Sequence, residues 1–298
     1  MLELAILESD VVATSEVTLL EKREKLFAHL QSLGSVVLGF SGGVDSTLLL
    51  KIAHDTLGKA RVRAVIGISE TYPERELLEA MQLAETIGAE YETIRTEETD
   101  VLKFQENPPD RCYYCKSELY DKLDTIRERL SFASVIDGTN ADDTKEFRPG
   151  LRALSERTVR SPLAESGLTK AEVRALSRME GLSTADKPSF ACLSSRFPYG
   201  MGIDKEKLKR IDAAENLLHD LGFRIVRVRF HDDRTARIEL GGMELVRAVQ
   251  PEIRESITQE FKRLGFTYIT LDLAGFRSGS MNEVLSEEQK LSYLSETN

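Results

Sequence analysis

The sequence predicts an α/β fold, a doubly wound parallel sheet followed by a smaller C-terminal α+β domain. Short apolar runs alternate with amphipathic segments of helical period between residues 36 and 137. A glycine-rich turn directly follows the first of these runs, which is typical of the first strand-to-helix junction in such folds. From Asp204 onward the pattern changes to a helix, two strands of alternating hydrophobicity, a helix and a strand. We therefore expect one domain over residues 1–200 and a second over residues 201–298.

Length, composition and charge are those expected of a cytoplasmic enzyme. The 298 residues are 41% hydrophobic, enough for a full core, and carry a net charge of −10. This charge argues against sequence-independent binding of nucleic acid, which is therefore not an expected partner. The first ten residues lack the basic segment of a secretory signal, and no apolar run approaches the ~20 residues that span a membrane.

The elements of the first domain follow from the spacing of apolar residues. The expected helices cover residues 15–33, 73–88 and 113–130, besides one that starts at the glycine turn. The expected strands cover residues 36–40, 62–68, 90–95 and 134–137. In a doubly wound sheet the carboxyl ends of the strands meet at one edge, which would gather Ser41, Ser69 and Asp137 there.

The glycine-rich turn is an expected binding site for a phosphate group. Gly42 and Gly43 allow positive φ angles that turn backbone N–H groups inward, and the start of the next helix adds partial positive charge. Ser41 and Ser46 add hydroxyl donors. The Gly-Lys-Ser/Thr ending of a Walker A loop is missing, and Asp45 stands in the turn, where it could hold Mg²⁺ on a phosphate.

This turn, Ser-Gly-Gly-Val-Asp-Ser at residues 41–46, resembles the pyrophosphate-binding loop of the PP-loop ATP pyrophosphatases. The resemblance implies cleavage of ATP between the α and β phosphates and transfer of AMP to an oxygen of the substrate. The alternative is a plain glycine turn with a serine that caps the helix.

A second polar segment, residues 137–143, ends the fourth expected strand and is followed by Arg148-Pro149-Gly150. By the strand-end rule Gly138 and its neighbours face the nucleotide, as does Ser69 after the second strand. Arg148 is a candidate to neutralise phosphate charge as the α–β bond breaks. A similar segment lines the ATP site in PP-loop enzymes, and the alternative is a polar surface turn.

The three cysteines suggest a metal site. Cys112 and Cys115 form a C-x-x-C pattern at a helix start, and Cys192 is the third. Three thiolates on a 4Fe-4S cluster would leave one iron open to a substrate or a sulfide, which suits sulfur transfer. The alternatives are buried inert cysteines, a redox dithiol, or a zinc site in which His231 supplies a fourth ligand.

The second domain is expected to contain helices over residues 204–221 and 243–264, and strands over residues 225–230, 235–240 and 268–273. Arg227 and Arg229 project from one face of the first of these strands. Two arginines so placed can bind a phosphate monoester in bidentate fashion. The alternative is a solvated strand face, or cross-strand ion pairs with Glu239.

Three further runs, together with the glycine turn, resemble the LarE family over nearly the whole chain. They are Cys-Leu-Ser-Ser-Arg-Phe-Pro-Tyr-Gly at 192–200, Val-Arg-Val-Arg-Phe-His at 226–231 and Leu-Asp-Leu-Ala-Gly-Phe-Arg-Ser-Gly at 271–279. LarE enzymes are ATP-dependent sulfur transferases that make the nickel-pincer nucleotide cofactor of lactate racemase. The resemblance implies that ATP and Mg²⁺ adenylate each of the two carboxylates of pyridinium-3,5-biscarboxylic acid mononucleotide, after which sulfur displaces AMP.

The same resemblance implies roles for further residues. Those expected to hold the phosphate of the substrate are Ser195, Arg196, Arg227 and Arg229. Glu215, on the preceding helix, is a candidate near the reaction centre. The resemblance also implies a homo-oligomer, with a hexamer as the expected state.

The cysteines divide the family into two chemistries. Members that sacrifice a single cysteine carry it one residue earlier, where this chain has Ala191. This chain has Cys192 and the added pair Cys112 and Cys115, which resembles the members that carry a 4Fe-4S cluster. We therefore predict that Cys192 is a cluster ligand in a catalytic, multi-turnover enzyme, with a sacrificial role for Cys192 as the alternative.

Two other classes of function remain open at this point. A PP-loop tRNA thiolase also combines three cluster-binding cysteines with this loop, but it would be expected to carry zinc-ribbon or basic RNA-binding modules, and this chain has neither. A nucleotide-binding or sulfur-carrier protein without catalytic activity is the second. Release of pyrophosphate with the pyridinium mononucleotide or with bulk tRNA would separate the three.

Overall fold

The computed structural model describes the backbone of residues 2–295 and the side chains of residues 18–293. The chain forms two compact units, each made from several segments of the sequence. The first contains residues up to 67, residues 76–95 and residues 116–189, and the second contains residues 68–75, 96–115 and those from 190 onward. The expected domain boundary after residue 200 stays a prediction, because a compact unit is not the same as a domain that folds alone.

The first unit is built on a four-stranded sheet of order β3-β2-β1-β4. Its strands are β1 (Val36–Gly39), β2 (Val62–Ile68), β3 (Glu90–Arg95) and β4 (Ser134–Ile136). β1 lies between β2 and β4 and is parallel to both. The strand order therefore reverses at β1, and ligands in such sheets bind at that point, beyond the carboxyl ends of the strands. The predicted doubly wound parallel sheet is confirmed.

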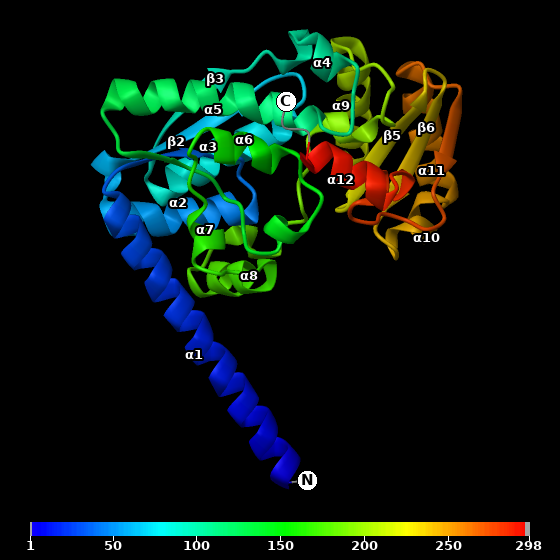
Figure 1. The fold of residues 1–298 in the computed structure, drawn as a ribbon. Helices are drawn as coiled ribbons and strands as arrows, with labels where there is room; N and C mark the ends of the chain where they lie inside the picture. Colours follow the sequence, from blue (N-terminus) through cyan, green and yellow to red (C-terminus); the bar gives the residue numbers. More distant parts are fainter. Residues whose placement is uncertain (1, 296–298) are drawn as a thin grey trace. The chain divides into compact units, whose positions relative to one another are not determined.

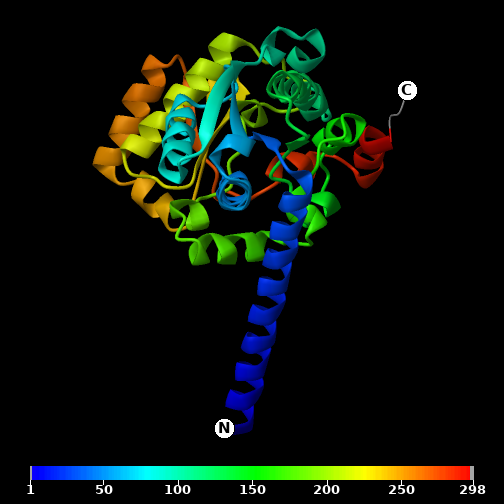
Figure 2. The same ribbon diagram turned by 90° about the vertical axis from the view of Figure 1, so that its left-hand side faces the viewer.

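Helices cover both faces of this sheet, with α2 and α5 on opposite sides (Figures 1 and 2). The helices are α1 (Leu2–Leu33), α2 (Val44–Leu57), α3 (Glu74–Ile87), α5 (Arg111–Leu130), α6 (Gly150–Glu156), α7 (Pro162–Glu165) and α8 (Lys170–Met179). α2 packs against α1 and α8. Leu48, Leu49 and Leu50 of α2 are fully buried, as are Val36, Val37 and Leu38 of β1, so the glycine turn joins two elements of the core.

The second unit is an α+β assembly around a three-stranded mixed sheet of order β5-β6-β7. β5 (Val226–Asp232) and β6 (Thr235–Leu240) are antiparallel, and β7 (Tyr268–Leu271) is parallel to β6. Its helices are α4 (Leu102–Gln105), α9 (Lys205–Asp220), α10 (Glu244–Ala248), α11 (Pro251–Arg263) and α12 (Glu287–Ser295). The predicted smaller C-terminal α+β part is confirmed.

Aromatic side chains fill the core of the second unit. The ring of Phe230 stacks on Phe197 with 5.2 Å between centroids, and meets Phe266 edge-on at 5.9 Å. Phe197 directly follows the turn that carries Cys192, so this turn is anchored to the core. In the part of the chain that the structure describes, no helix is long and apolar enough to cross a membrane.

The single helix expected over residues 243–264 is wrong. Two helices, α10 and α11, occupy this stretch, and Gln250 between them is extended, with φ −61° and ψ 141°. The cause is Pro251, the first residue of α11, because a proline ring disfavours the helical conformation in the residue before it.

Candidate active site

The glycine turn joins β1 to α2 where the strand order reverses. Gly42 has a φ of +62°, and a Cβ added to it would lie 2.9 Å from the Cβ of Ala80. Glycine is therefore required at residue 42 both for its conformation and for space. Gly43 caps α2 with φ −77° and ψ 164°, so the positive φ expected there is wrong.

The two serines of the turn hold it in shape. The Oγ of Ser46 accepts a hydrogen bond from the backbone N–H of Ser41 at 3.3 Å and donates one to the carbonyl of Gly43 at 3.2 Å. It also lies 3.2 Å from the Oγ of Ser41. The turn is thus closed on itself at the N-terminus of a core helix, which favours negative charge.

Asp45 is the acidic group of the turn, and two side chains from distant segments bind it. The amide of Asn140, which is 1% exposed, donates to Oδ1 of Asp45 at 3.1 Å. The ammonium of Lys170 forms an ion pair with Oδ2 of Asp45. Lys170 is not among the predicted site residues, so the structure adds one cation to the predicted site.

Lys170 is held in place by the start of α8. It is the first residue of that helix, after a capping box in which the side chains of Thr169 and Glu172 bind each other's backbone N–H groups. The backbone N–H of Lys170 also donates to Oδ2 of Asp142 at 2.9 Å. The capping-box spacing is visible in the sequence and could have drawn attention to Lys170.

The segment after β4 divides into structural and site-facing residues. Asp137 is buried and accepts hydrogen bonds from Tyr120 at 3.1 Å and from Thr139 and Ser161 at 2.7 Å each, so its carboxylate serves the fold. Gly138 lies directly against the glycine turn, because a Cβ added to it would be 2.9 Å from the backbone nitrogen of Ser46.

Arg148 lies in the same polar cluster. Its guanidinium forms ion pairs with Asp143 at 2.7 Å and with Glu146 at 3.0 Å, and its side chain is 48% exposed. Burial raises the pKa of the Asp143 carboxyl, which the charge of Arg148 lowers only in part, and nearby Asp45 raises it further. Such a carboxylate cluster benefits from added positive charge, as from Mg²⁺.

Ser69 belongs to the second unit and has local partners there. Its Oγ donates to Glu98 at 2.5 Å, and the hydroxyl of Thr71 donates to the same carboxylate oxygen at 2.8 Å. Glu98 is 2% exposed. A place for Ser69 beside Ser41 at one nucleotide site stays a prediction.

All three cysteines lie in the second unit. Cys112 is exposed, and Cys115 and Cys192 are half-buried, so the alternative of buried inert cysteines is wrong. Among the residues that the structure describes, no three His, Cys, Asp or Glu side chains are positioned to hold a metal ion.

Two cysteine segments meet through Asn107, a buried residue with the unusual φ of +53°. Its side-chain amide donates to the carbonyl of Pro198 at 2.7 Å, and its own carbonyl accepts the N–H of Gly200 at 2.9 Å. These bonds join the segment before Cys112 to the segment after Cys192.

A buried arginine lies between these two segments. Arg111 is 4% exposed, and its guanidinium lies 5.2 Å from the centre of the Tyr199 ring. Burial alone would lower the pKa of Arg111, but its neighbours Cys112, Cys192 and Tyr199 together outweigh burial and raise this pKa. Its Nε and Nη1 make no hydrogen bond within the described structure. A buried cation therefore directly precedes Cys112 in the chain and contacts the ring of Tyr199.

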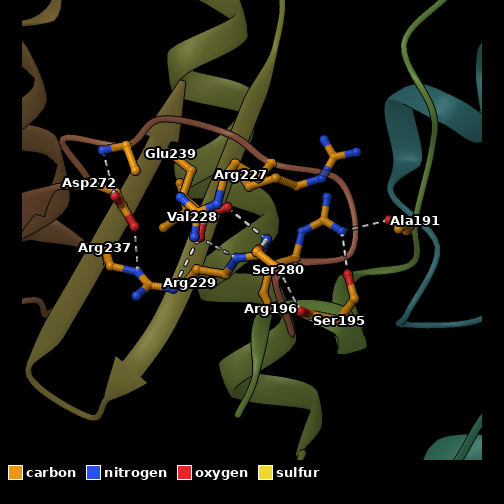
Figure 3. A network of polar contacts seen from close by, with 12 residues as sticks. Ala191, Ser195, Arg196, Arg227, Val228, Arg229, Arg237, Glu239, Asp272 and Ser280 are labelled. Atoms are coloured by element: carbon orange, nitrogen blue, oxygen red, sulfur yellow. Dashed lines mark hydrogen bonds and ion pairs between the residues drawn. The ribbon is translucent and has the colours of Figure 1, made fainter. Parts of the chain in front are cut away.

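The arginines expected at the phosphate of the substrate are placed very differently (Figure 3). Arg196 is 1% exposed and binds Glu215 through Nε at 2.9 Å and Nη2 at 2.8 Å. Arg229 binds Glu239 in the same two-pronged way, at 2.9 and 2.7 Å, so the cross-strand ion pair with Glu239 is confirmed for this arginine. Arg227 is half-buried, with its guanidinium 5.0 Å from the ring of Phe276.

Glu215 is buried between these groups and stays ionised. Burial raises its pKa, but the charge and hydrogen bonds of Arg196 outweigh this and lower it. Its Oε1 also accepts the backbone N–H of Val228 at 2.8 Å. The roles of Ser195, Arg196, Arg227 and Arg229 at a phosphate, and of Glu215 near the reaction centre, stay predictions.

Known proteins resemble both the glycine turn and the whole chain. A family model described as NAD synthase matches residues 22–127, which include the turn. An NH(3)-dependent NAD(+) synthetase of Aeropyrum pernix is 46% identical over 22% of this chain and 24% of its own length. An uncharacterized protein of Synechocystis is 44% identical over 89% of this chain and 98% of its own length.

One relative with a named activity covers almost the whole chain. It is the pyridinium-3,5-bisthiocarboxylic acid mononucleotide synthase of Lactiplantibacillus plantarum, a LarE protein, 41% identical over 91% of this chain and 98% of its own length. The shorter matches cover the ATP-activating part that LarE proteins share with NAD synthases. The chain therefore belongs to the LarE family and is an ATP-using sulfur transferase of the PP-loop type.

Proposed function

We propose that this enzyme converts the carboxylates of pyridinium-3,5-biscarboxylic acid mononucleotide into thiocarboxylates. The observation that carries the proposal is the glycine turn at the switch point of the sheet, with Asp45 as its acidic group. The name of the Lactiplantibacillus plantarum relative supports the choice of substrate, since its product is the bisthiocarboxylic acid mononucleotide.

The first step is activation of a carboxylate by ATP. A carboxylate oxygen attacks the α-phosphorus, the bond to the β-phosphate breaks, and pyrophosphate leaves. The N–H groups and hydroxyls of Ser41, Gly42, Gly43 and Ser46 would bind the pyrophosphate. Lys170 and Arg148 lie in the same polar cluster and would offset the charge that develops on it.

Asp45 fits a role as magnesium ligand. Mg²⁺ commonly takes one or two carboxylates together with phosphate oxygens and water, so a single aspartate in a phosphate-binding turn is sufficient. Bound there, Mg²⁺ would neutralise charge on the β and γ phosphates.

The second step is displacement of AMP. A hydrosulfide adds to the acyl carbon of the adenylate, the bond from that carbon to the phosphate oxygen breaks, and AMP and one proton are released. The thiocarboxylate remains. The step needs a source of hydrosulfide, which a cluster held by the three cysteines would carry.

We propose that Cys112, Cys115 and Cys192 hold a 4Fe-4S cluster. The chemistry of the donor set fits, because the three thiols lie in one compact unit and none of them is buried, although the described structure does not bring all three together. When bound, such a cluster would leave one iron open to carry a sulfide. Ala191 at the place of the sacrificed cysteine supports this choice over a consumed Cys192.

The activity is tested by release of pyrophosphate from ATP with the pyridinium mononucleotide and with bulk tRNA in parallel. We expect turnover with the pyridinium mononucleotide and none with bulk tRNA. Stimulation by tRNA alone would favour a tRNA thiolase, and no turnover with either would favour a carrier protein.

The cluster is tested by purification without oxygen, with iron, sulfide and visible absorption measured on the wild type and on Cys112→Ala. We expect a brown protein with about four irons per chain, lost in the variant. A colourless protein in which Cys192 becomes lighter by the mass of H₂S during turnover would show the sacrificial chemistry.

Assembly and location are proposed from the family resemblance. We propose a homo-oligomer, with a hexamer as the expected state, in the cytoplasm. Light scattering coupled to size-exclusion chromatography measures the oligomeric state directly, and a monomer would contradict the proposed homo-oligomer.

A further inference from the structure

The turn that carries Cys192 is held by arginine side chains at three of its carbonyl groups. Cys192 caps a short 3-10 helix, Leu193–Arg196. Nη1 of Arg196 donates to the carbonyls of Ala191 at 2.7 Å and of Cys192 at 3.0 Å. Nη1 of Arg229 donates to the carbonyl of Ser195 at 2.8 Å. The backbone on both sides of Cys192 is thus fixed by charged donors (Figure 3).

Each arginine is itself fixed by a buried glutamate. Glu215 and Glu239 are 5% and 1% exposed, and each binds its arginine through two parallel hydrogen bonds. Removing one partner of a buried ion pair leaves an uncompensated charge, so neither pair opens easily. The carbonyl-binding nitrogens cannot swing away without breaking these pairs.

This arrangement leaves little of Arg196 for a phosphate. Its Nε and Nη2 face Glu215, and its Nη1 faces the carbonyls of Ala191 and Cys192 and the hydroxyl of Ser195. The side chain is buried, and a phosphate dianion would meet the negative charge of Glu215.

We propose that the Arg196–Glu215 pair is a positioning device that sets the place of Cys192, and that it does not bind the phosphate of the substrate. Arg229 and Glu239 hold the other end of the same turn. The pair fixes the backbone beside Cys192 and thereby holds the Cys192 sulfur in one orientation. The importance of that orientation for catalysis rests on the proposed function, but the effect on the turn does not.

The effect on the turn is tested by amide hydrogen exchange of a peptide spanning residues 191–197, without substrate. We compare Arg196→Lys and Glu215→Gln with Glu206→Gln, an exposed glutamate on the same helix, α9. Lysine keeps the charge but loses the two-pronged geometry. We expect exchange at least about tenfold faster in the first two variants and unchanged in the control.

Alkylation of the metal-free protein with iodoacetamide gives a second reading. We expect the rate at Cys192, measured by peptide mass, to rise several-fold in Arg196→Lys while the rate at exposed Cys112 stays the same. Should Arg196→Lys fail to fold, Glu215→Gln carries the same test. A folded Glu215→Gln protein with unchanged exchange at residues 191–197 would overturn the proposal.

Kinetics with the pyridinium mononucleotide separate positioning from phosphate binding. A positioning role predicts that kcat falls and KM changes less than about threefold. A tenfold higher KM with unchanged kcat would instead make Arg196 a phosphate ligand. If the mononucleotide is not a substrate at all, the proposed function fails, while the exchange and alkylation results still decide the role of the pair.

Discussion

At the scale of single residues, Asp45 is the point where distant parts of the first unit converge. Asn140 donates to one of its carboxylate oxygens and Lys170 pairs with the other. Lys170 thus supplies a positive charge directly at the Asp45 carboxylate. The carboxylate of Asp45 is therefore held from two sides by side chains of distant segments.

We expect Asp45→Asn to reduce pyrophosphate release at least about 100-fold, because the variant loses the proposed magnesium ligand. Lys170→Met should cost about 10- to 100-fold in kcat/KM for ATP, the usual range for a lost charged hydrogen bond. Steady-state release of pyrophosphate measures both. Lys22→Met is the matched control, because Lys22 forms an ion pair at 2.7 Å with Glu172, which lies in α8 as Lys170 does. Equal losses in Lys22→Met and Lys170→Met would contradict a specific role for Lys170.

Asp212 predicts a pH dependence of stability. Burial and the charges of Glu215 and Glu74 raise the pKa of Asp212 to about 6, although Arg196 lowers it in part. The charged form is therefore disfavoured in the folded protein, and stability falls as the pH rises from about 4 to above 6. We expect Asp212→Asn to raise the Tm at pH 8 and to bring a smaller gain at pH 5.

The control for this experiment is Asp233→Asn, which changes an exposed aspartate of the same unit. Its Tm should differ from that of the wild type by the same small amount at both pH values. An increase in Tm for Asp212→Asn that is as large at pH 5 as at pH 8 would contradict the raised pKa of Asp212.

At the scale of elements, two loops that follow different strands are in direct contact. The turn after β1 and the segment after β4 touch where Gly138 meets Ser46, and a Cβ on Gly138 would lie 2.9 Å from the backbone nitrogen of Ser46. The same turn meets α3 where Gly42 lies against Ala80. Small residues at these contacts allow the backbone of the turn to close over an anion.

We expect Gly138→Ala to destabilise the protein by about 1–3 kcal/mol and to weaken ATP use, because the backbone of the turn must move to admit the methyl group. Gly43→Ala is the matched change within the turn. Gly43 has a φ of −77°, and a Cβ there meets only the Oγ of Ser41, at 3.4 Å. Its effect should stay under about 1 kcal/mol. Chemical denaturation measures the stability of the two variants, and pyrophosphate release measures their use of ATP. Equal losses of stability in Gly138→Ala and Gly43→Ala would contradict the steric argument.

At the scale of the whole molecule, the chain divides its chemistry between two compact units. The glycine turn with its acidic and basic partners belongs to the first unit, and the three cysteines with the paired arginines belong to the second. Each unit has its own sheet. We infer that activation by ATP depends on the first unit, and that sulfur delivery depends on the second.

The aromatic core of the second unit predicts how firmly the cysteine turn is held. Phe230 is fully buried and stacks on Phe197, the residue after the turn. We expect Phe230→Ala to cost about 3–5 kcal/mol of unfolding free energy, the usual range for a buried phenylalanine. Chemical denaturation measures this loss. A cost below about 1 kcal/mol would show that the core collapses around the missing ring.

The fold class, the strands of the sheet and the glycine turn follow from local patterns. Apolar spacing marks β2 over Val62–Ile68, β3 over Glu90–Arg95 and β6 over Thr235–Leu240 at their observed bounds. The break between α10 and α11 was missed although Pro251 marks it, because the apolar period continues across the proline.

The sequence by itself determined the class of the fold, a doubly wound parallel sheet, and the place of the glycine turn after its first strand, because both depend on short-range spacing. Only the tertiary structure decided which charged side chains of distant segments form ion pairs. Lys170 reaches Asp45 across 125 residues, and Arg196 turns to Glu215 and the carbonyls beside Cys192. Ion pairs between distant segments depend on how helices and strands pack, and no local pattern records that packing. For this reason the pairing of Arg196 with Glu215 was not predicted, whereas the pairing of Arg229 with Glu239 across a short hairpin was one of the predicted alternatives.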